Sequence, residues 1–141
     1  MSELGYAGDV DSRRAWEMLE ADPKAVLVDV RTAPECRYVG APDLRPLAKA
    51  PVFVEWQSYP DLAVNPGFAA EVEGQGVRKD ATLLLLCRSG ARSRAAAILL
   101  TKLGFARCYN VADGFEGAKD AEGHRGRAAG WKAAGLPWSQ D

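Results

Sequence analysis

The chain lacks a hydrophobic run long enough to cross a membrane. Its apolar stretches, such as AVLVDV and LLLLC, fall far short of the roughly 20 residues that a transmembrane helix needs. Its beginning, MSELGYAGDVDSRR, contains no apolar segment of the kind found in secretory signal peptides. We therefore expect a cytoplasmic protein with no membrane partner.

Cysteine, histidine and net charge are also scarce. Three scattered cysteines form no CxxC pair and are too few for a disulfide framework, and the single histidine, His124, creates no zinc-ligand cluster. The formal net charge of −1 gives no basic face for nucleic acid. We expect reduced thiols, no nucleic-acid partner, no metal and no organic cofactor.

The 141 residues, of which 48% are hydrophobic, suit one domain spanning 1–141. Short apolar strands alternate with helices, which is typical of an α/β fold with a mainly parallel sheet. The expected strands are 25–31, 51–56, 81–87 and 107–111. The expected helices are 12–21, 34–39, a helix ending near 76 that starts with Asn65 as its N-cap, 92–105 with its end at Gly104, and a short one at 131–135.

The segment LLLLCRSGARSR, residues 83–94, is the strongest chemical signal. Cys87 ends an apolar strand, and ligands of parallel sheets bind beyond such strand ends. A helix follows about five residues later, so its N-terminus and the loop amides favour a thiolate over a thiol. Cys87 is therefore the predicted nucleophile. The predicted substrate-binding residues are Arg88, Ser89, Gly90, Ala91, Arg92 and Ser93.

Three motifs resemble those of the rhodanese (sulfurtransferase) family. CRSGARS looks like its active-site loop, VLVDVRTAPECRYVG like its N-terminal signature, and YNVADGFEG followed by WKAAGLPW like its C-terminal signature. They occur in the family's usual order over nearly the whole chain. The resemblance implies a rhodanese-like fold, with about five mainly parallel strands and helices on both faces, and a persulfide on Cys87.

The spacing between Cys87 and Arg92 bears on the reaction. By resemblance, sulfur-handling loops of this family place the arginine five positions after the cysteine, as here. Related phosphatases and arsenate reductases carry one more residue, which gives a wider cradle. The shorter loop favours a sulfane sulfur over a phosphate, and leaves a small phosphatase or arsenate reductase as the less favoured enzyme.

The implied reaction moves sulfur from a small anionic donor such as thiosulfate to a nucleophilic acceptor, which is cyanide, a thiol or a protein. A non-enzymatic sulfur-carrier or regulatory interaction module is the alternative from a different class. We expect a monomer, because the chain is one small domain.

Several residues are expected to support the site without reacting. Asp29 and Arg31 match the first signature and are interpreted as structural support at the strand end. Glu35 either pairs with an arginine or faces water. The sequence departs from the family pattern in an insertion, residues 118–130, which delays a tryptophan expected directly after Gly117 until Trp131.

Overall fold

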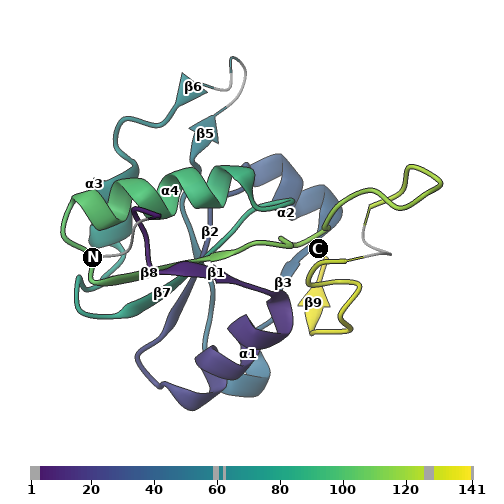
Figure 1. The fold of residues 1–141 in the computed structure, drawn as a ribbon, viewed down its shortest axis with the longest axis horizontal. Coiled ribbons are helices and arrows are strands. Elements are labelled where there is room, and N and C mark those ends of the chain that lie inside the picture. Colours follow the sequence, from purple (N-terminus) through teal and green to yellow (C-terminus); the bar gives the residue numbers. More distant parts are fainter. Residues whose placement is uncertain (1–3, 59–60, 62, 126–128, 141) are drawn as a thin grey trace.

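Five parallel strands form the central sheet. The computed structural model describes residues 4–58, 61, 63–125 and 129–140. The strand order is β1-β8-β7-β2-β4, and each neighbouring pair is parallel. The strands are β1 (Gly8–Val10), β2 (Val26–Asp29), β4 (Val52–Phe53), β7 (Thr82–Leu86) and β8 (Arg107–Val111). The expected α/β class with a five-stranded parallel sheet is confirmed (Figure 1).

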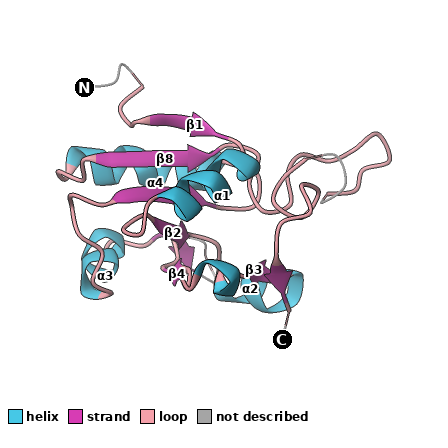
Figure 2. Ribbon diagram, turned by 90° about the horizontal axis from the view of Figure 1, so that it is seen from below, coloured by secondary structure: helices cyan, strands magenta, loops and turns pink. Residues whose placement is uncertain are grey.

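Helices cover both faces of this sheet. Figure 2 shows α1 and α4 on opposite sides of the strands. No helix formed by the described residues has the length and apolar character needed to cross a bilayer. The helices are α1 (Ser12–Ala21), α2 (Ala33–Val39), α3 (Phe68–Gly74) and α4 (Ala91–Lys102), with a 3₁₀ turn at Arg45–Leu47.

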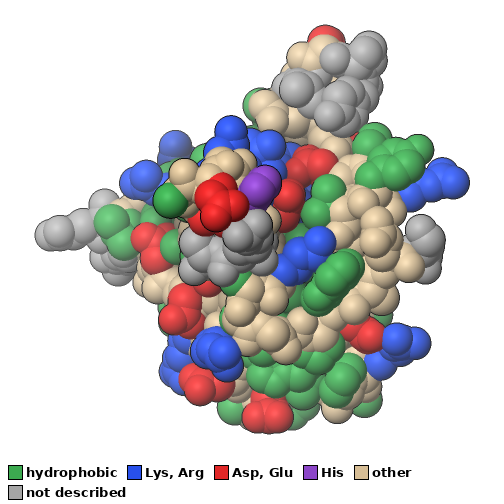
Figure 3. Space-filling model, turned by 90° about the vertical axis from the view of Figure 1, so that its right-hand side faces the viewer, with side chains coloured by type: hydrophobic (Ala, Val, Ile, Leu, Met, Phe, Trp, Pro, Cys, Tyr) green, Lys and Arg blue, Asp and Glu red, His purple; other side chains and the backbone are tan. Residues whose placement is uncertain are grey.

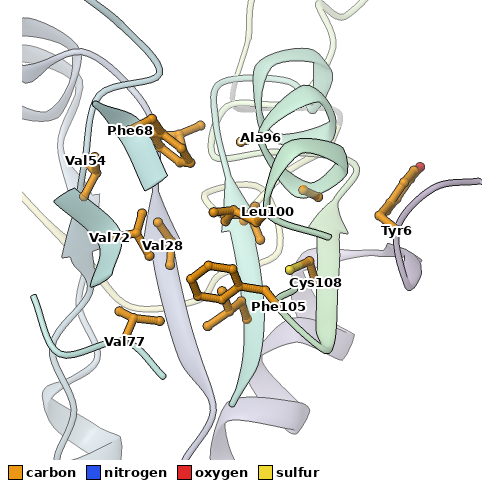
Figure 4. Packing of buried hydrophobic residues seen from close by; sticks show 14 of the residues in the cluster. Tyr6, Val28, Val54, Phe68, Val72, Val77, Ala96, Leu100, Phe105 and Cys108 are labelled. Carbon is orange, nitrogen blue, oxygen red and sulfur yellow. The ribbon is translucent and has the colours of Figure 1, made fainter. Parts of the chain in front are cut away.

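The leucines of β7 divide the core into two layers. Leu83 and Leu85 pack with α3 and α4 (Figure 4), whereas Leu84 and Leu86 pack with α1 on the other face. Successive side chains of a strand point to opposite faces, so an unbroken apolar run is stable only where both faces are covered. This double burial fixes β7 and hence the position of Cys87 at its end.

Several expected elements differ from those observed. β1 was not predicted, because GDV has only three residues and is held by pairing with β8 rather than by its own pattern. Residues 131–135 form turns instead of a helix. α3 begins at Phe68, since Asn65 Oδ1 accepts a hydrogen bond from the Gly67 N–H (3.0 Å) and so closes a turn before the helix.

Two small antiparallel ribbons complete the chain. β3 (Ala41–Pro42) pairs with β9 (Trp138–Ser139), which returns the end of the chain to α2. β5 (Gln57–Ser58) pairs with β6 (Ala63–Val64) in a hairpin that projects from the body of the molecule (Figure 1). The end of β4, strand β5 and the loops that follow β2 and β8 lie together at the carboxyl-terminal edge of the sheet.

Candidate active site

Cys87 lies in a tight turn between β7 and α4. It is 1% exposed, and its Sγ accepts a hydrogen bond from the backbone N–H of Gly90 at 3.1 Å. Gly90 has φ +104°, and a Cβ there would collide with the carbonyl oxygen of Ala112. Only glycine fits this combination of left-handed backbone and close approach. The turn therefore aims an amide donor at the sulfur.

The first turn of α4 adds a positive environment to the same sulfur. The first hydrogen bond within α4 runs from the Arg94 N–H to the Gly90 carbonyl, so the N–H groups of Ala91, Arg92 and Ser93 have no acceptor within the helix. The helix dipole also places partial positive charge at this end. Ser93 Oγ lies 3.2 Å from Cys87 Sγ. An anion on this sulfur thus faces the Gly90 amide and the positive end of the α4 dipole.

Arg92 forms a bidentate ion pair with Glu35 on α2. Arg92 Nη1 and Nη2 lie 2.6 and 2.8 Å from the two Glu35 carboxylate oxygens, and the side chains are only 21% and 19% exposed. Burial alone raises the pKa of Glu35, but the hydrogen bonds and charge of Arg92 lower that pKa to about 2. Of the two interpretations of Glu35, pairing with an arginine is confirmed.

Glu35 also caps the N-terminus of α2. Its Oε1 accepts hydrogen bonds from the N–H and hydroxyl of Thr32, and the Thr32 hydroxyl accepts from the Glu35 N–H, which completes a capping box. The same carboxylate therefore fixes the start of α2 and the guanidinium of Arg92, which belongs to the segment 87–93, called here the cysteine loop. One residue connects two elements of the site.

Asp29 and Arg31 form a buried ion pair behind the loop. Arg31 Nε lies 2.9 Å and Nη2 2.7 Å from the Asp29 oxygens, and both side chains are fully buried. The Arg31 guanidinium carbon also stands 4.3 Å from the centre of the Phe115 ring. Phe115 N–H in turn donates to the carbonyl of Cys87 (2.8 Å). The pair thus lies at the end of β2 and contacts Phe115, whose N–H bonds to the Cys87 carbonyl.

A cavity of about 400 Å³ opens beside the cysteine loop. Acidic and basic side chains gather near the middle of this face (Figure 3). Arg125, Glu116 and Gln57 were not predicted, because they come from two loops and from the short strand β5, whose course the sequence does not reveal. The lining residues are Thr32, Glu35, Val39, Gln57, Arg88, Arg92, Glu116 and Arg125.

The insertion leaves and re-enters the fold at one point. A Cβ on Gly117 would collide with Ala129, and one on Gly130 would lie 2.7 Å from the Gly117 nitrogen. Trp131 N–H donates to the Gly114 carbonyl (2.9 Å), and the Trp131 side chain is fully buried. Trp131 therefore lies close to Gly117 in the fold, although the insertion separates the two residues in the sequence. Residues 126–128 of this insertion lie outside the described part of the chain.

The other thiols have surroundings that oppose ionisation. Burial and the charge of Asp29 raise the pKa of Cys36 to about 12. Burial raises the pKa of Cys108 to about 11. Cys108 packs in the core, and His124 lies on an exposed loop. Neither thiol faces the donors that surround Cys87.

A parallel sheet with a cysteine at the end of a strand, before a helix and in a loop that contains arginines, is the arrangement of a rhodanese-like domain. A family model described as the STR4 middle domain matches residues 7–141. The chain belongs to this family and, with it, to the rhodanese-like domains.

Individual relatives match nearly the whole chain. The crystal structure of Rv0390 from M. tuberculosis is 51% identical, with a TM-score of 0.89 over 96% of this chain and 99% of that one. An uncharacterized Rickettsia conorii protein is 38% identical over 92% of this chain and 95% of its own length. The chloroplastic protein Thylakoid rhodanese-like of Oryza sativa subsp. indica is 30% identical over 94% of this chain, which spans 25% of that relative.

A more distant structure shares the fold alone. The polysulfide-sulfur transferase homodimer of Wolinella succinogenes is 20% identical, with a TM-score of 0.65 over 97% of this chain and 80% of that one.

Proposed function

We propose that this protein is a sulfurtransferase that carries a sulfane sulfur as a persulfide on Cys87. The observation that carries the proposal is the placement of Cys87 Sγ, which receives the Gly90 N–H at 3.1 Å beside the N-terminus of α4. Amides and a helix dipole that converge on sulfur stabilise the thiolate, which is the reactive form. The name of the Wolinella relative adds support for sulfur chemistry on this fold.

In the first step the Cys87 thiolate attacks the outer sulfur of a donor such as thiosulfate. A new bond forms between Sγ and that sulfur, the bond to the sulfonate sulfur breaks, and sulfite leaves with the electron pair. We assign to Arg88 and Arg125, which line the cavity, the attraction of the dianionic donor, and to Arg88, next to Cys87, the stabilisation of the departing sulfite. The charge of Arg92 is already compensated by Glu35, so we assign Arg92 mainly to holding the loop.

In the second step a nucleophile takes the sulfur. Cyanide, a thiol or a protein acceptor attacks the outer sulfur, and the Cys87 thiolate leaves with the electron pair of the broken bond. The loop amides hold the negative charge in both steps. The enzyme returns to its starting state, and no resident cofactor takes part in the proposed cycle.

Intact-protein mass after incubation with thiosulfate, and in parallel with polysulfide, tests this function. We expect wild type and the control variant Cys36→Ser to gain one sulfur atom that cyanide removes, and Cys87→Ser to gain none. Folded wild-type protein that gains no sulfur from either donor would refute the proposal and favour the interaction module. Turnover of an aryl phosphate lost in Cys87→Ser would instead favour the phosphatase.

A further inference from the structure

A chain of side-chain hydrogen bonds runs from the edge strand β1 to the sulfur of Cys87. Asn110 on β8 is 3% exposed, and its Nδ2 donates to Asp9 Oδ1 at 3.0 Å. On its other side, Asn110 Oδ1 accepts from the Ser93 hydroxyl at 2.6 Å. Ser93 Oγ in turn lies 3.2 Å from Cys87 Sγ. Only Ser93 separates Asn110 from the proposed nucleophile.

Asp9 fixes the orientation of the Asn110 amide. A carboxylate only accepts hydrogen bonds, so the NH₂ group of the amide must face Asp9 and its oxygen must face Ser93. Tyr6 donates its hydroxyl to the same Asp9 oxygen at 2.8 Å. Burial and the contact with Asp9 raise the pKa of Tyr6, which keeps this hydroxyl a donor. The amide oxygen is therefore a permanent acceptor for Ser93.

Ser93 has one hydroxyl hydrogen and two acceptors within reach. The amide oxygen of Asn110 is closer (2.6 Å against 3.2 Å for sulfur), and Asp9 holds that oxygen toward Ser93. When the hydrogen points to Asn110, the lone pairs of Ser93 face Cys87. They accept a hydrogen bond from a thiol but give nothing to a thiolate.

We propose that Asn110 is a positioning residue that withholds the Ser93 hydroxyl hydrogen from the sulfur of Cys87. The negative charge on Cys87 is then held by the Gly90 amide and the start of α4 without the Ser93 hydroxyl. A consequence that rests on the proposed function concerns the second step. The acceptor bonds to the outer sulfur, the S–S bond breaks, and its electron pair goes to Sγ. With one donor fewer for this charge, the persulfide is discharged more slowly and is retained for longer.

Alkylation of Cys87 by iodoacetamide tests the inference without any sulfur donor. Iodoacetamide reacts with cysteine through its thiolate, and Cys36 and Cys108 react little because their pKa values are raised. We expect Asn110→Leu to accelerate alkylation about three- to tenfold, the effect of one hydrogen bond to a charged sulfur. Arg92 and Glu35, the charged pair nearest the loop, are unchanged in this variant.

A double-mutant cycle separates this role from packing. In a Ser93→Ala background, Asn110→Leu should change the rate by less than about twofold, because no hydroxyl remains to be released. Asp9→Asn, on the exposed edge strand, serves as a second variant: it removes the constraint on the amide and should accelerate alkylation in the same direction. Equal or slower alkylation in both Asn110→Leu and Asp9→Asn, or an acceleration that survives in Ser93→Ala, would overturn the inference.

Discharge of the persulfide by cyanide is the second readout. Asn110→Leu should release sulfur severalfold faster than wild type, and the double variant should match Ser93→Ala. If wild type takes up no sulfur, the proposed function fails while the alkylation result still decides the role of Asn110. If sulfur is taken up but Asn110→Leu discharges it no faster, the consequence for persulfide retention is wrong.

Discussion

At the scale of single residues, the site is defined by which charges are already compensated. Three arginines line the cavity, but Arg92 is bound by both oxygens of Glu35. A bidentate pair between partly buried groups is stronger and more rigid than an exposed ion pair. Arg92 therefore holds α2 against the cysteine loop, and the attraction of an anion in the proposed reaction falls to Arg88 and Arg125.

The Glu35–Arg92 pair predicts a pH-dependent stability. The pKa of Glu35 falls from its ordinary 4.5 to about 2 in the folded protein, so its stabilisation is present above the ordinary value and is lost as pH falls towards 2. Glu35→Gln should lower the free energy of unfolding by about 2 to 3 kcal/mol near pH 7, because it leaves Arg92 without a counter-ion.

Urea unfolding of wild type and Glu35→Gln, near pH 7 and near pH 3, measures this effect. The difference between the two proteins should shrink on acidification, because only wild type has a carboxylate to protonate. A control substitution of the exposed Glu17, which pairs with Arg14 at 3.4 Å, should cost less than about 1 kcal/mol. A Glu35→Gln penalty independent of pH would contradict the assignment.

At the scale of elements, the turn from β7 to α4 is shaped by one glycine. Gly90→Ala should lower stability by several kcal/mol and abolish sulfur uptake, because its Cβ meets the Ala112 carbonyl. Gly76→Ala is a matched control: Gly76 also has a left-handed φ (+87°), but nothing lies within 4 Å of its Cβ. It should cost only about 1 kcal/mol. Similar penalties in both variants, measured by chemical unfolding, would show that strain rather than close approach matters.

The inserted loop contributes the charge of Arg125 to the cavity. Arg125 Nη1 donates to the Gly117 carbonyl at 2.8 Å, which holds its side chain near the loop base. Arg125→Gln should raise the KM for thiosulfate about threefold and leave kcat within about twofold, because a rim charge acts on binding more than on bond breaking. Arg78→Gln, which alters an exposed arginine in the loop before β7, should change neither value. A fall in kcat alone would contradict this role.

The elements also show what sequence can and cannot reveal. β7 and its cysteine were predictable. A continuous apolar strand is stable only when both of its faces are buried, and a cysteine followed by glycine and arginines is typical of a loop that activates a thiol. The pairing of Asp9 with Asn110 was not, since these residues are 101 positions apart and β1 is stable only against β8. The resemblance implied a persulfide on Cys87, and that assignment stays a prediction. No local pattern indicates that Arg125 reaches the cavity.

At the scale of the whole molecule, net charge does not account for the proposed attraction of an anionic donor. The chain carries −1 overall, so attraction of a dianion depends on local charge at the carboxyl-terminal edge, within a Debye length of about 8 to 10 Å at moderate salt. The positive side chains come from two separate segments, the cysteine loop and the insertion, while Glu35 of α2 compensates Arg92. The cysteine loop is tied to the sheet by buried contacts, whereas the insertion is held at its base.

This arrangement predicts that the insertion is separable from the fold. Gly117 and Gly130 are already in contact at the base of the insertion. Replacing residues 118–129 by two glycines should shift Tm by only a few degrees, because the entropy of closing a loop changes slowly with its length.

The same variant should take up sulfur with the raised KM of Arg125→Gln, because both lack one arginine at the cavity. Thermal unfolding and steady-state kinetics on the two variants, side by side, make the comparison. A loop-deleted protein that unfolds at a much lower temperature would show that the insertion supports the buried Trp131. If it folds normally but loses more activity than Arg125→Gln, further groups of the insertion act on the substrate. The prediction that the insertion contributes only the charge of Arg125 would then be wrong.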